Sequence, residues 1–298
     1  MNIVAAMTTP FTYEFGYSWF ITWGHLVPLA LFGGLAALGI WLKWRRWLVI
    51  GSSLIAMWAI AGLLMTHFLF RLGFPQQLPT DQFLTSGTGR VVDIGAGSGR
   101  AAIGLLLAKP RVTVTAVDIY KGYYGIDDNT PERFMVNARI AGVADRAEAK
   151  VGDARELPLA AGTYDGVISL AAIDHLPRAS IPNALAEAAR VLKPDGEFLL
   201  MIVNADAWAW LASPHAIAHH RRADPGEWRA WLESSGFDVV EQGTQPGALY
   251  FFSRKGSPVG RALSGAPGEP DRARPTSKPS MLMAQNGQGK RLVSPRSP

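Results

Sequence analysis

Two long apolar runs lie near the start of the chain. Residues 19–42 contain a single strongly polar side chain, His25, and residues 48–70 contain no charged side chain. About twenty apolar residues are enough for a helix to cross the hydrocarbon core of a bilayer. Tryptophans cluster beside both runs, as is typical of a membrane–water interface; they are Trp19, Trp23, Trp41, Trp44 and Trp47. We therefore predict a transmembrane helical hairpin over residues 19–71, preceded by a short N-terminal segment, 1–18.

Small residues in both runs favour close packing of the two helices against each other. They are Gly33, Gly34, Ala37, Gly51, Ala56, Ala59 and Gly62. The competing interpretation is a buried helical hairpin of a soluble domain, but two such runs in tandem exceed ordinary core helices. The loop between the runs carries Lys43, Arg45 and Arg46. The positive-inside rule would place this loop in the cytoplasm and both chain termini on the other side.

From residue 90 onward, short strand-like segments alternate with longer helix-like segments. Strands are predicted at residues 90–94, 112–119, 148–151, 164–170 and 197–203. Helices are predicted at 98–108, 131–141, 181–192 and 224–235, and two further strands, 237–242 and 248–254, should form a hairpin. This alternation predicts an α/β domain over residues 90–255, with a mainly parallel sheet covered by helices on both faces. The prolines and glycines of residues 72–89 predict a linker before it.

The amino-acid composition excludes several kinds of functional site. The chain has no cysteine, which excludes disulfides, thiolate metal sites and cysteine nucleophiles. The formal net charge of +5 belongs to residues 256–298, which are rich in Gly, Pro, Ser and Arg and are predicted to form a disordered basic tail. The remainder of the chain is neutral overall, so no nucleic-acid partner is expected. No metal site is expected either, because the histidines of residues 204–222 lack carboxylates at ligand spacing.

The candidate chemistry begins at residues 91–100, where an apolar strand breaks into a glycine turn and then opens a helix. Such a turn lets a ligand lie against bare backbone at a helix N-terminus. Gly95, Gly97 and Gly99 alternate, and Arg100 takes the place of the third glycine of the dinucleotide fingerprint. No Gly-Lys-Ser/Thr sequence follows, so the phosphate loop of an NTPase is absent.

This stretch resembles the first motif of class I S-adenosylmethionine-dependent methyltransferases. Further elements follow in the order of that family: Asp118 ends the second strand, Asp153 follows the third, and Asp174 and His175 follow the fourth. The resemblance covers roughly residues 85–255 and implies a Rossmann-like, seven-stranded sheet with an antiparallel last strand. It also implies S-adenosyl-L-methionine as the cofactor. Residues 129–158 resemble the ubiquinone/menaquinone-biosynthesis and arsenite groups, of which the arsenite group is disfavoured because it needs cysteine thiolates.

The resemblance assigns roles to individual residues. Asp93 and the glycine loop would hold the methionine part of the cofactor, and Asp118 would accept hydrogen bonds from both ribose hydroxyls. Asp153 and Ala154 would bind adenine, and Ser169 and Leu170 would lie close to the methyl group. The complete cofactor-binding prediction is Asp93, Gly95, Ala96, Gly97, Gly99, Asp118, Ile119, Asp153, Ala154 and Ser169. The alternative role for Asp93 is to cap the glycine turn without touching the ligand.

Asp174 and His175 are the predicted catalytic residues. A general base is needed only when the methyl acceptor is a poorly acidic hydroxyl or amine. The alternative is that His175 lines the pocket and touches the substrate without proton transfer. Residues 204–222 combine tryptophans with histidines and arginines, which predicts a lid that meets the membrane surface.

These features together predict a multi-pass protein of the cell membrane that methylates a small, lipophilic acceptor. The catalytic domain should face the cytoplasm, where its cofactor is supplied, although the basic loop at residues 43–46 indicates the opposite orientation. Anchoring favours a lipophilic acceptor because it raises the local concentration of substrates that reside in the membrane. A soluble small-molecule acceptor, or a non-catalytic membrane scaffold that retains the fold, are the alternatives. The oligomeric state is not predicted.

Overall fold

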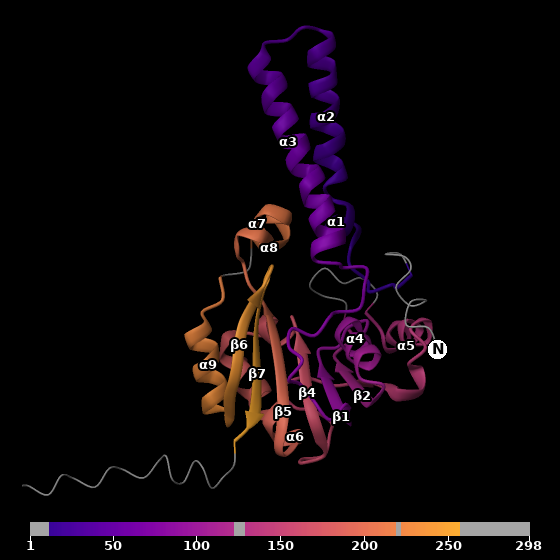
Figure 1. Ribbon diagram of the computed structural model, residues 1–298, viewed down its shortest axis with the longest axis vertical. Coiled ribbons are helices and arrows are strands. Elements are labelled where there is room, and N and C mark those ends of the chain that lie inside the picture. Colours follow the sequence, from indigo (N-terminus) through magenta and orange to yellow (C-terminus); the bar gives the residue numbers. More distant parts are fainter. Residues whose placement is uncertain (1–11, 122–128, 219–221, 257–298) are drawn as a thin grey trace, which may run out of the picture.

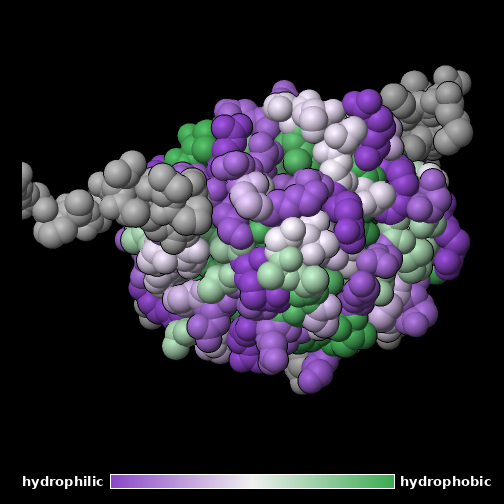
Figure 2. Space-filling model, turned by 90° about the horizontal axis from the view of Figure 1, so that it is seen from below, coloured by the Kyte–Doolittle hydropathy of each residue, from purple (hydrophilic) through white to green (hydrophobic). Residues whose placement is uncertain are grey.

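A computed structural model of the chain describes residues 12–121, 129–218 and 222–256. A helical hairpin rises from one edge of an α/β domain (Figure 1). The opposite end of the domain has hydrophilic and hydrophobic residues intermixed (Figure 2). The hairpin differs, because large apolar side chains cover most of its outer surface.

Seven strands form one sheet in the order β3-β2-β1-β4-β5-β7-β6. The neighbours from β3 to β5 pair in parallel, whereas β7 runs antiparallel to both β5 and β6. The predicted seven-stranded, Rossmann-like sheet with an antiparallel last strand is therefore confirmed. The strands are β1 (Thr88–Ile94), β2 (Arg111–Asp118), β3 (Ala147–Val151), β4 (Tyr164–Leu170), β5 (Leu192–Val203), β6 (Phe237–Gln245) and β7 (Ala248–Lys255).

Helices cover both faces of this sheet and bury two apolar clusters against it. α4 (Arg100–Ala108) and α5 (Pro131–Ile140) pack on one face, and α6 (Ile181–Val191) and α9 (Pro225–Ser234) on the other. Capping residues fix two of the helix starts: the Thr130 side chain accepts from Arg133 N at 3.2 Å, and Asp224 accepts from Gly226 N at 2.9 Å. Short helical turns complete the domain: η3 (Ala144–Arg146), η4 (Ile173–His175), η5 (Arg178–Ser180), α7 (Ala207–Ala212) and α8 (Pro214–Ile217).

One strand begins earlier than the pattern predicts. β5 starts directly after α6, so that Leu192 pairs with Tyr164 before the register shifts and Glu197 pairs with Gly166. The Pro-Asp-Gly sequence at 194–196 forms the irregularity inside the strand, with Asp195 at a φ of +60°. Lys193 binds Asp165 at 2.6 Å beside it. The Pro-Asp-Gly sequence therefore forms a bulge within β5, and does not form a turn that separates β5 from α6.

The hairpin consists of four helical pieces: α1 (Trp19–Trp23), α2 (Leu26–Trp41), α3 (Arg46–Leu64) and a π-helical turn, η2 (Met65–Leu69). The first predicted helix is broken at Gly24 and His25. The ring of His25 is buried against Gly62, where an added Cβ would lie 2.2 Å from His25 Nε2. The glycine thus makes room for the histidine between the two helices.

Small residues form the seam between α2 and α3, as expected. Only some of the small residues that the sequence suggested belong to this seam. Ala36, Gly39, Ala56, Ala59 and Gly62 are buried. In contrast, a Cβ added at Gly33, Gly34 or Gly51 would meet nothing within 4 Å. Outside this seam most of the hairpin is exposed. In the most apolar stretch of Trp19–Trp41 only 22% is buried, and in that of Arg46–Leu69 only 17% is buried. By length and composition both helices are able to cross a membrane.

Residues 72–87, within the predicted linker 72–89, form no helix or strand, and β1 already begins at Thr88; the segment packs on the domain. Phe83 is fully buried and Leu84 N donates to Glu197 Oε2 at 2.6 Å. An added Cβ on Gly104 of α4 would lie 1.9 Å from Gln76 O, so this segment crosses α4 in direct backbone contact. The hairpin is consequently held against the domain rather than attached by a free tether.

Candidate functional site

A cavity of about 840 Å³ lies at the carboxyl edge of the sheet, beneath the base of the hairpin. The loops after β1, β2, β3 and β4 line one part of it, and the end of β5, the hairpin base and α7–α8 line the rest. Ligands of open α/β sheets bind at this edge, and the volume is near the upper end of the range for small-molecule sites. The cavity therefore joins the predicted cofactor site to a second, more apolar space.

The glycine loop between β1 and α4 forms the floor of the cofactor end. Gly95, Gly97 and Gly99 all have a positive φ, of 72°, 53° and 93°, which residues other than glycine rarely adopt. An added Cβ on Gly95 would lie 2.1 Å from the Cβ of Ala172. Gly99 does not line the cavity; an added Cβ there would lie 2.6 Å from the Phe134 ring. At Gly95 and Gly97 the loop therefore presents only backbone to a ligand, and Ala96 and Ser98 beside these glycines also line the cavity.

Asp118 lines the cavity at the end of β2 and organises the loops around it. Its Oδ2 accepts a hydrogen bond from Gly97 N at 2.9 Å. Its Oδ1 accepts from Tyr120 N at 2.7 Å and from Asn129 Nδ2 at 3.2 Å. One carboxylate thereby fixes the glycine loop relative to the segment after β2, and it remains exposed to the cavity.

Asp93 lies behind the glycine loop rather than in the cavity wall. Its side chain is 1% exposed, and its Oδ2 accepts from Ala102 N at 3.0 Å in the first turn of α4. Within the described part of the chain its Oδ1 has no hydrogen-bond partner. Burial, and to a smaller extent the negative charge of Asp118, raise the pKa of Asp93 to about 8, although the hydrogen bond from Ala102 N acts in the opposite direction. This placement matches the capping role better than direct contact with the cofactor.

The loop after β3 supplies the other polar wall of the cofactor end, through Asp153 and Ala154. Asp153 forms an ion pair with Arg155 at 2.6 Å and also accepts from Arg155 N at 2.8 Å. The hydrogen bond to the Arg155 side chain holds the pKa of Asp153 below its usual value. An adenine amino group would therefore share this carboxylate with the guanidinium. Ile119, at the end of β2, completes this wall.

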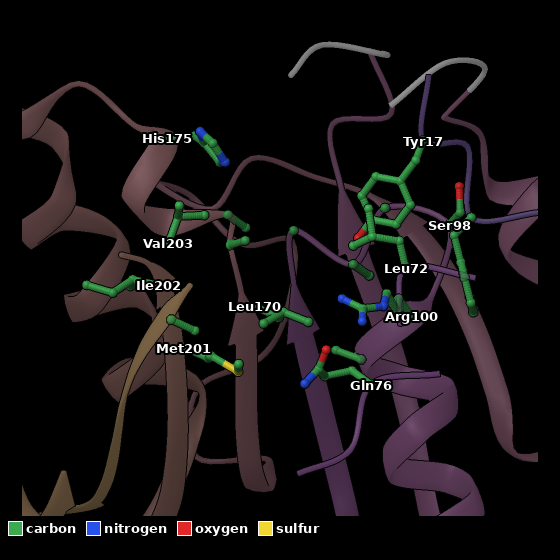
Figure 3. A pocket seen from close by; sticks show the side chains of 18 of the residues that line it. Tyr17, Leu72, Gln76, Ser98, Arg100, Leu170, His175, Met201, Ile202 and Val203 are labelled. Carbon is green, nitrogen blue, oxygen red and sulfur yellow. The ribbon is translucent and has the colours of Figure 1, made fainter. Parts of the chain in front are cut away.

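Two predicted site residues belong to the framework of the cavity. Ser169 is buried and donates to Ile94 O at 2.9 Å, which ties β4 to β1. Asp174 Oδ2 accepts from Val203 N at 2.9 Å and so holds η4 against the end of β5. Neither side chain lines the cavity, whereas His175 does. Figure 3 shows His175 above Val203, across the cavity from Tyr17.

The wall of the acceptor end comes from segments far apart in the sequence. Its apolar lining includes Phe15, Tyr17, Leu69, Phe70, Leu72, Leu170, Met201, Ile202, Val203, Ala209, Ala212 and Ile217. Gln76 and Gln245 also line the cavity and carry no charge. The sequence did not predict these residues as site residues, apart from Leu170, which was expected near the methyl group, and α7–α8, which falls in the predicted lid. The aromatic alternation of residues 13–17 is the one local signal that points to the first of these segments.

The segment before the hairpin packs beside the glycine loop. Tyr13 and Phe15 are buried, and Glu14 exchanges two backbone hydrogen bonds of 2.9 Å with the Asn137 side chain of α5. The same Asn137 amide donates to Ser98 O at 2.9 Å. This arrangement holds residues 13–18 over the cavity.

Arg100 connects the glycine loop to the chain that leaves the hairpin. It donates to Phe70 O at 2.6 Å and to Phe74 O at 3.0 Å, and its own carbonyl accepts from Gln76 N at 2.9 Å. Sequence analysis recognised Arg100 only as a departure from the dinucleotide fingerprint. The structure makes it the link between the cofactor loop and the hairpin base.

Comparison with known proteins agrees with this geometry. Residues 91–196 match the family model of a methyltransferase domain. The chain is 32% identical to the malonyl-[acyl-carrier protein] O-methyltransferase of Geobacter sulfurreducens, over 51% of this chain and 57% of that protein. It is 35% identical to the ubiquinone/menaquinone biosynthesis C-methyltransferase of Methylobacterium nodulans, over 51% of this chain and 66% of that protein. A solved structure, an O-methyltransferase family 2 protein from Planctomyces limnophilus in complex with apigenin, is 19% identical, with a TM-score of 0.47 over 68% of this chain and 69% of that one.

The chain thus carries a class I S-adenosylmethionine-dependent methyltransferase domain. S-adenosylmethionine is the cofactor of methyltransferases with this fold. The chain spans between half and two thirds of the length of these two curated relatives, and the family model matches residues of the α/β domain, not of the hairpin.

Proposed function

We propose that this protein is a membrane-anchored enzyme that transfers the methyl group of S-adenosylmethionine to a small, lipophilic acceptor. The observation that carries this proposal is the shared cavity. The glycine loop and Asp118 line one end, and the base of the apolar hairpin lines the other. A cofactor held at the first end would therefore direct its reactive group toward a space whose walls are mainly apolar.

The residues of the first end fit S-adenosylmethionine. Asp118 has two carboxylate oxygens at the cavity, which suits the two hydroxyls of a ribose. The bare backbone of Gly95 and Gly97 allows the methionine part to lie close to the chain. Asp153 and Ala154 take the adenine. Bound there, the cofactor supplies a methyl group that is already activated by its attachment to a positively charged sulfur.

The remaining catalytic task of the protein is to align the acceptor and to keep water away. Alignment of reacting groups can lower a barrier by about 7–11 kcal/mol. Leu170 and Met201, at the ends of β4 and β5, supply apolar walls for this purpose. His175 reaches the same space from η4 and is the proposed base for an acceptor proton. Asp174 then acts as a positioning residue, because its bond to Val203 N fixes η4.

The role of His175 is tested by its replacement. If His175 removes a proton from the acceptor, His175→Ala lowers the rate of methyl transfer by about 10²–10⁴-fold and flattens the acidic limb of the pH–rate profile. Cofactor affinity stays unchanged. A small loss with an unaltered pH profile would assign His175 to substrate contact alone.

The exposed apolar surface of the hairpin supports membrane anchoring. Trp41 is 77% exposed and Phe68 is 74% exposed, and they lie at opposite ends of the hairpin. Patches of this kind are typical of membrane or protein interaction sites. The basic loop with Lys43, Arg45 and Arg46 lies at the far end of the hairpin from the domain (Figure 1).

We propose a cytoplasmic domain, because the cofactor is supplied there, and this places the basic loop outside. A reporter fused after residue 256 that is active only in the cytoplasm should give a signal. A signal only from a periplasmic or extracellular reporter would reverse the orientation and favour the positive-inside rule.

Two measurements test the proposed function. Calorimetry on the full chain in lipid nanodiscs should detect binding of S-adenosylmethionine, and the absence of binding would leave a non-catalytic scaffold. Mass spectrometry should then compare lipid and aqueous extracts of cells with and without the gene. A methylated species missing from the lipid extract of the deletion strain supports the lipophilic acceptor. A change confined to the aqueous extract would assign a soluble acceptor instead.

A further inference from the structure

The cavity reaches the protein surface at chemically different places. Phe20 of α1 and Leu69 of η2 line it and are also 55% and 43% exposed, so they form an apolar rim at the hairpin base. At the cofactor end, the exposed lining residues include Lys121 and Arg155, and Arg155 is paired with Asp153, so that these residues form a charged, polar rim. A ligand passing the first rim meets hydrocarbon side chains, and one passing the second meets charged side chains.

The helical pair α7–α8 lies at the end of the domain that is next to the base of the hairpin (Figure 1). Trp58 of α3 donates from Nε1 to Leu211 O of α7 at 2.8 Å. Trp58 belongs to α3, the helix that is proposed to span the bilayer, so α7 is in direct contact with that helix. Ala209 and Ala212 of α7 are buried and line the cavity, whereas Trp208, Trp210 and Leu211 of the same helix are 53%, 46% and 45% exposed.

The helix α7 therefore has two apolar faces with different surroundings. One face closes the cavity, and the other continues the exposed apolar surface of the hairpin. Tryptophan side chains on such a helix are typical of an element that lies in the membrane interface. Continuity with α3, through the Trp58 bond, indicates that the lipid bilayer is what covers the outer face of α7.

From this geometry we infer that the cavity has two entrances: the acceptor enters from the lipid leaflet, between the hairpin base and α7–α8, and the cofactor enters from water past Lys121 and Arg155. This inference rests on the proposed function and specifies its substrate class. The acceptor is an amphipathic molecule whose apolar tail stays in the bilayer passage. Its reacting end reaches the space lined by Gln76, His175 and Gln245, where neutral hydrogen-bonding groups and one imidazole are available.

The position of α7 is tested first, by spin labels on single cysteines. The chain has no native cysteine, so each label is unique. Phe68→Cys reports on the hairpin, Trp210→Cys on the outer face of α7, and Val240→Cys on an exposed part of β6. In phosphatidylcholine–phosphatidylglycerol nanodiscs, labels at 68 and 210 should collide with oxygen and be shielded from a nickel chelate, and the label at 240 should show the reverse. A label at 210 that behaves like the one at 240 overturns the inference.

The passage itself is tested with a photoactivatable probe. A phosphatidylcholine with a diazirine in its acyl chain, incorporated in the nanodiscs, should give adducts on residues 201–203, at the end of β5. Ala212→Trp fills the passage and should abolish these adducts. Ala218→Trp, on an exposed position at the end of α8 outside the cavity, should leave them unchanged. Both variants should bind S-adenosylmethionine with the affinity of the unmodified chain, because the cofactor uses the polar rim at Lys121 and Arg155.

The outcomes separate this inference from the proposed function. Absence of adducts on residues 201–203, or equal labelling in the two tryptophan variants, overturns the lipid entrance and leaves cofactor binding untouched. If Ala212→Trp weakens cofactor binding as much as it blocks labelling, the two entrances are one, and the inference also fails. Failure of the unmodified chain to bind the cofactor overturns the proposed function, while the labelling pattern still reports on the passage.

Discussion

The two ends of the cavity are built in different ways. At the proposed cofactor end, one glycine loop and carboxylates at successive strand ends line the cavity, and Asp118 holds the loop through Gly97 N. At the acceptor end, apolar side chains come from the N-terminal segment, the hairpin base, the end of β5 and α7–α8. The first end depends on backbone conformation and a few charges, and the second depends on how distant segments pack. Leaving aside the catalytic step assigned to His175, single substitutions should therefore change binding and stability strongly at the first end and weakly at the second.

The largest effect is expected for Asp118→Ala. It removes the proposed ribose acceptor and leaves Gly97 N and Tyr120 N without their carboxylate partner. Hydrogen bonds to a charged group contribute about 1.5–3 kcal/mol each, so cofactor affinity should fall by roughly 100-fold or more. Titration calorimetry measures the loss. Asp145→Ala, at an exposed position outside the cavity, is the control; similar affinities in both variants would contradict the assigned role.

The next effect separates backbone conformation from steric contact in the glycine loop. Gly95→Ala and Gly142→Ala both place a side chain at positive φ, of 72° and 69°. Each should lose about 1–2 kcal/mol of folding free energy for that reason. Only Gly95→Ala also drives its Cβ into Ala172, which adds about 1–3 kcal/mol and displaces the segment that carries His175. Denaturant unfolding of the reconstituted chain measures the difference, and equal losses would refute the close contact.

Asp93 should make folding stability depend on pH. Its pKa in the folded chain, about 8, is above that of an unfolded carboxyl, so the folded state retains a proton that the unfolded state loses. The contribution of Asp93 to folding stability is then complete below about pH 4 and declines as pH rises toward 8, by up to about 1.4 kcal/mol per pH unit. Asp93→Asn should remove this decline, whereas Asp145→Asn should not. Thermal unfolding between pH 5 and pH 8 tests it, and identical slopes in all three proteins would argue against a neutral Asp93.

The smallest effect belongs to the acceptor end. Trp58→Phe keeps most of the ring but loses the bond from Nε1 to Leu211 O. A neutral hydrogen bond contributes about 0.5–1.5 kcal/mol, so α7 should open more often without unfolding the domain. Hydrogen exchange of residues 207–217 should be faster than in the unmodified chain. Trp47→Phe, at an exposed position at the far end of the hairpin, should leave this exchange unchanged.

The sequence predicted the cofactor end better than the acceptor end, and the reason is physical. Gly95, Gly97 and Asp118 follow their strands directly, so local pattern and strand direction place them at the carboxyl edge. Whether a neighbouring residue faces the cavity depends on the orientation of its side chain. Asp93 and Ser169 are close to the site in sequence but are turned into hydrogen bonds with Ala102 N and Ile94 O.

The acceptor end could not be predicted because it depends on long-range packing. The aromatic alternation around Phe15 marks a segment that could be buried, but neither it nor the sequence around Phe70 indicates that both segments fold onto the carboxyl edge of the sheet. The same holds for residues 72–89, whose composition indicates a linker, although Phe83 is fully buried in the domain core. The two helices of the hairpin could be predicted because their apolar runs are long. The break at His25 could not, because it reflects a contact with Gly62 across the seam.

The central claim is that one cavity joins a cofactor site to an acceptor space supplied by the membrane. The most direct measurement incubates the full chain, in nanodiscs made with membrane lipids of its source cells, with S-adenosylmethionine labelled in the methyl group. The account predicts that label appears in the organic extract and that Asp118→Ala abolishes it. Label that appears only in the aqueous phase, or that appears equally with Asp118→Ala, would contradict the account.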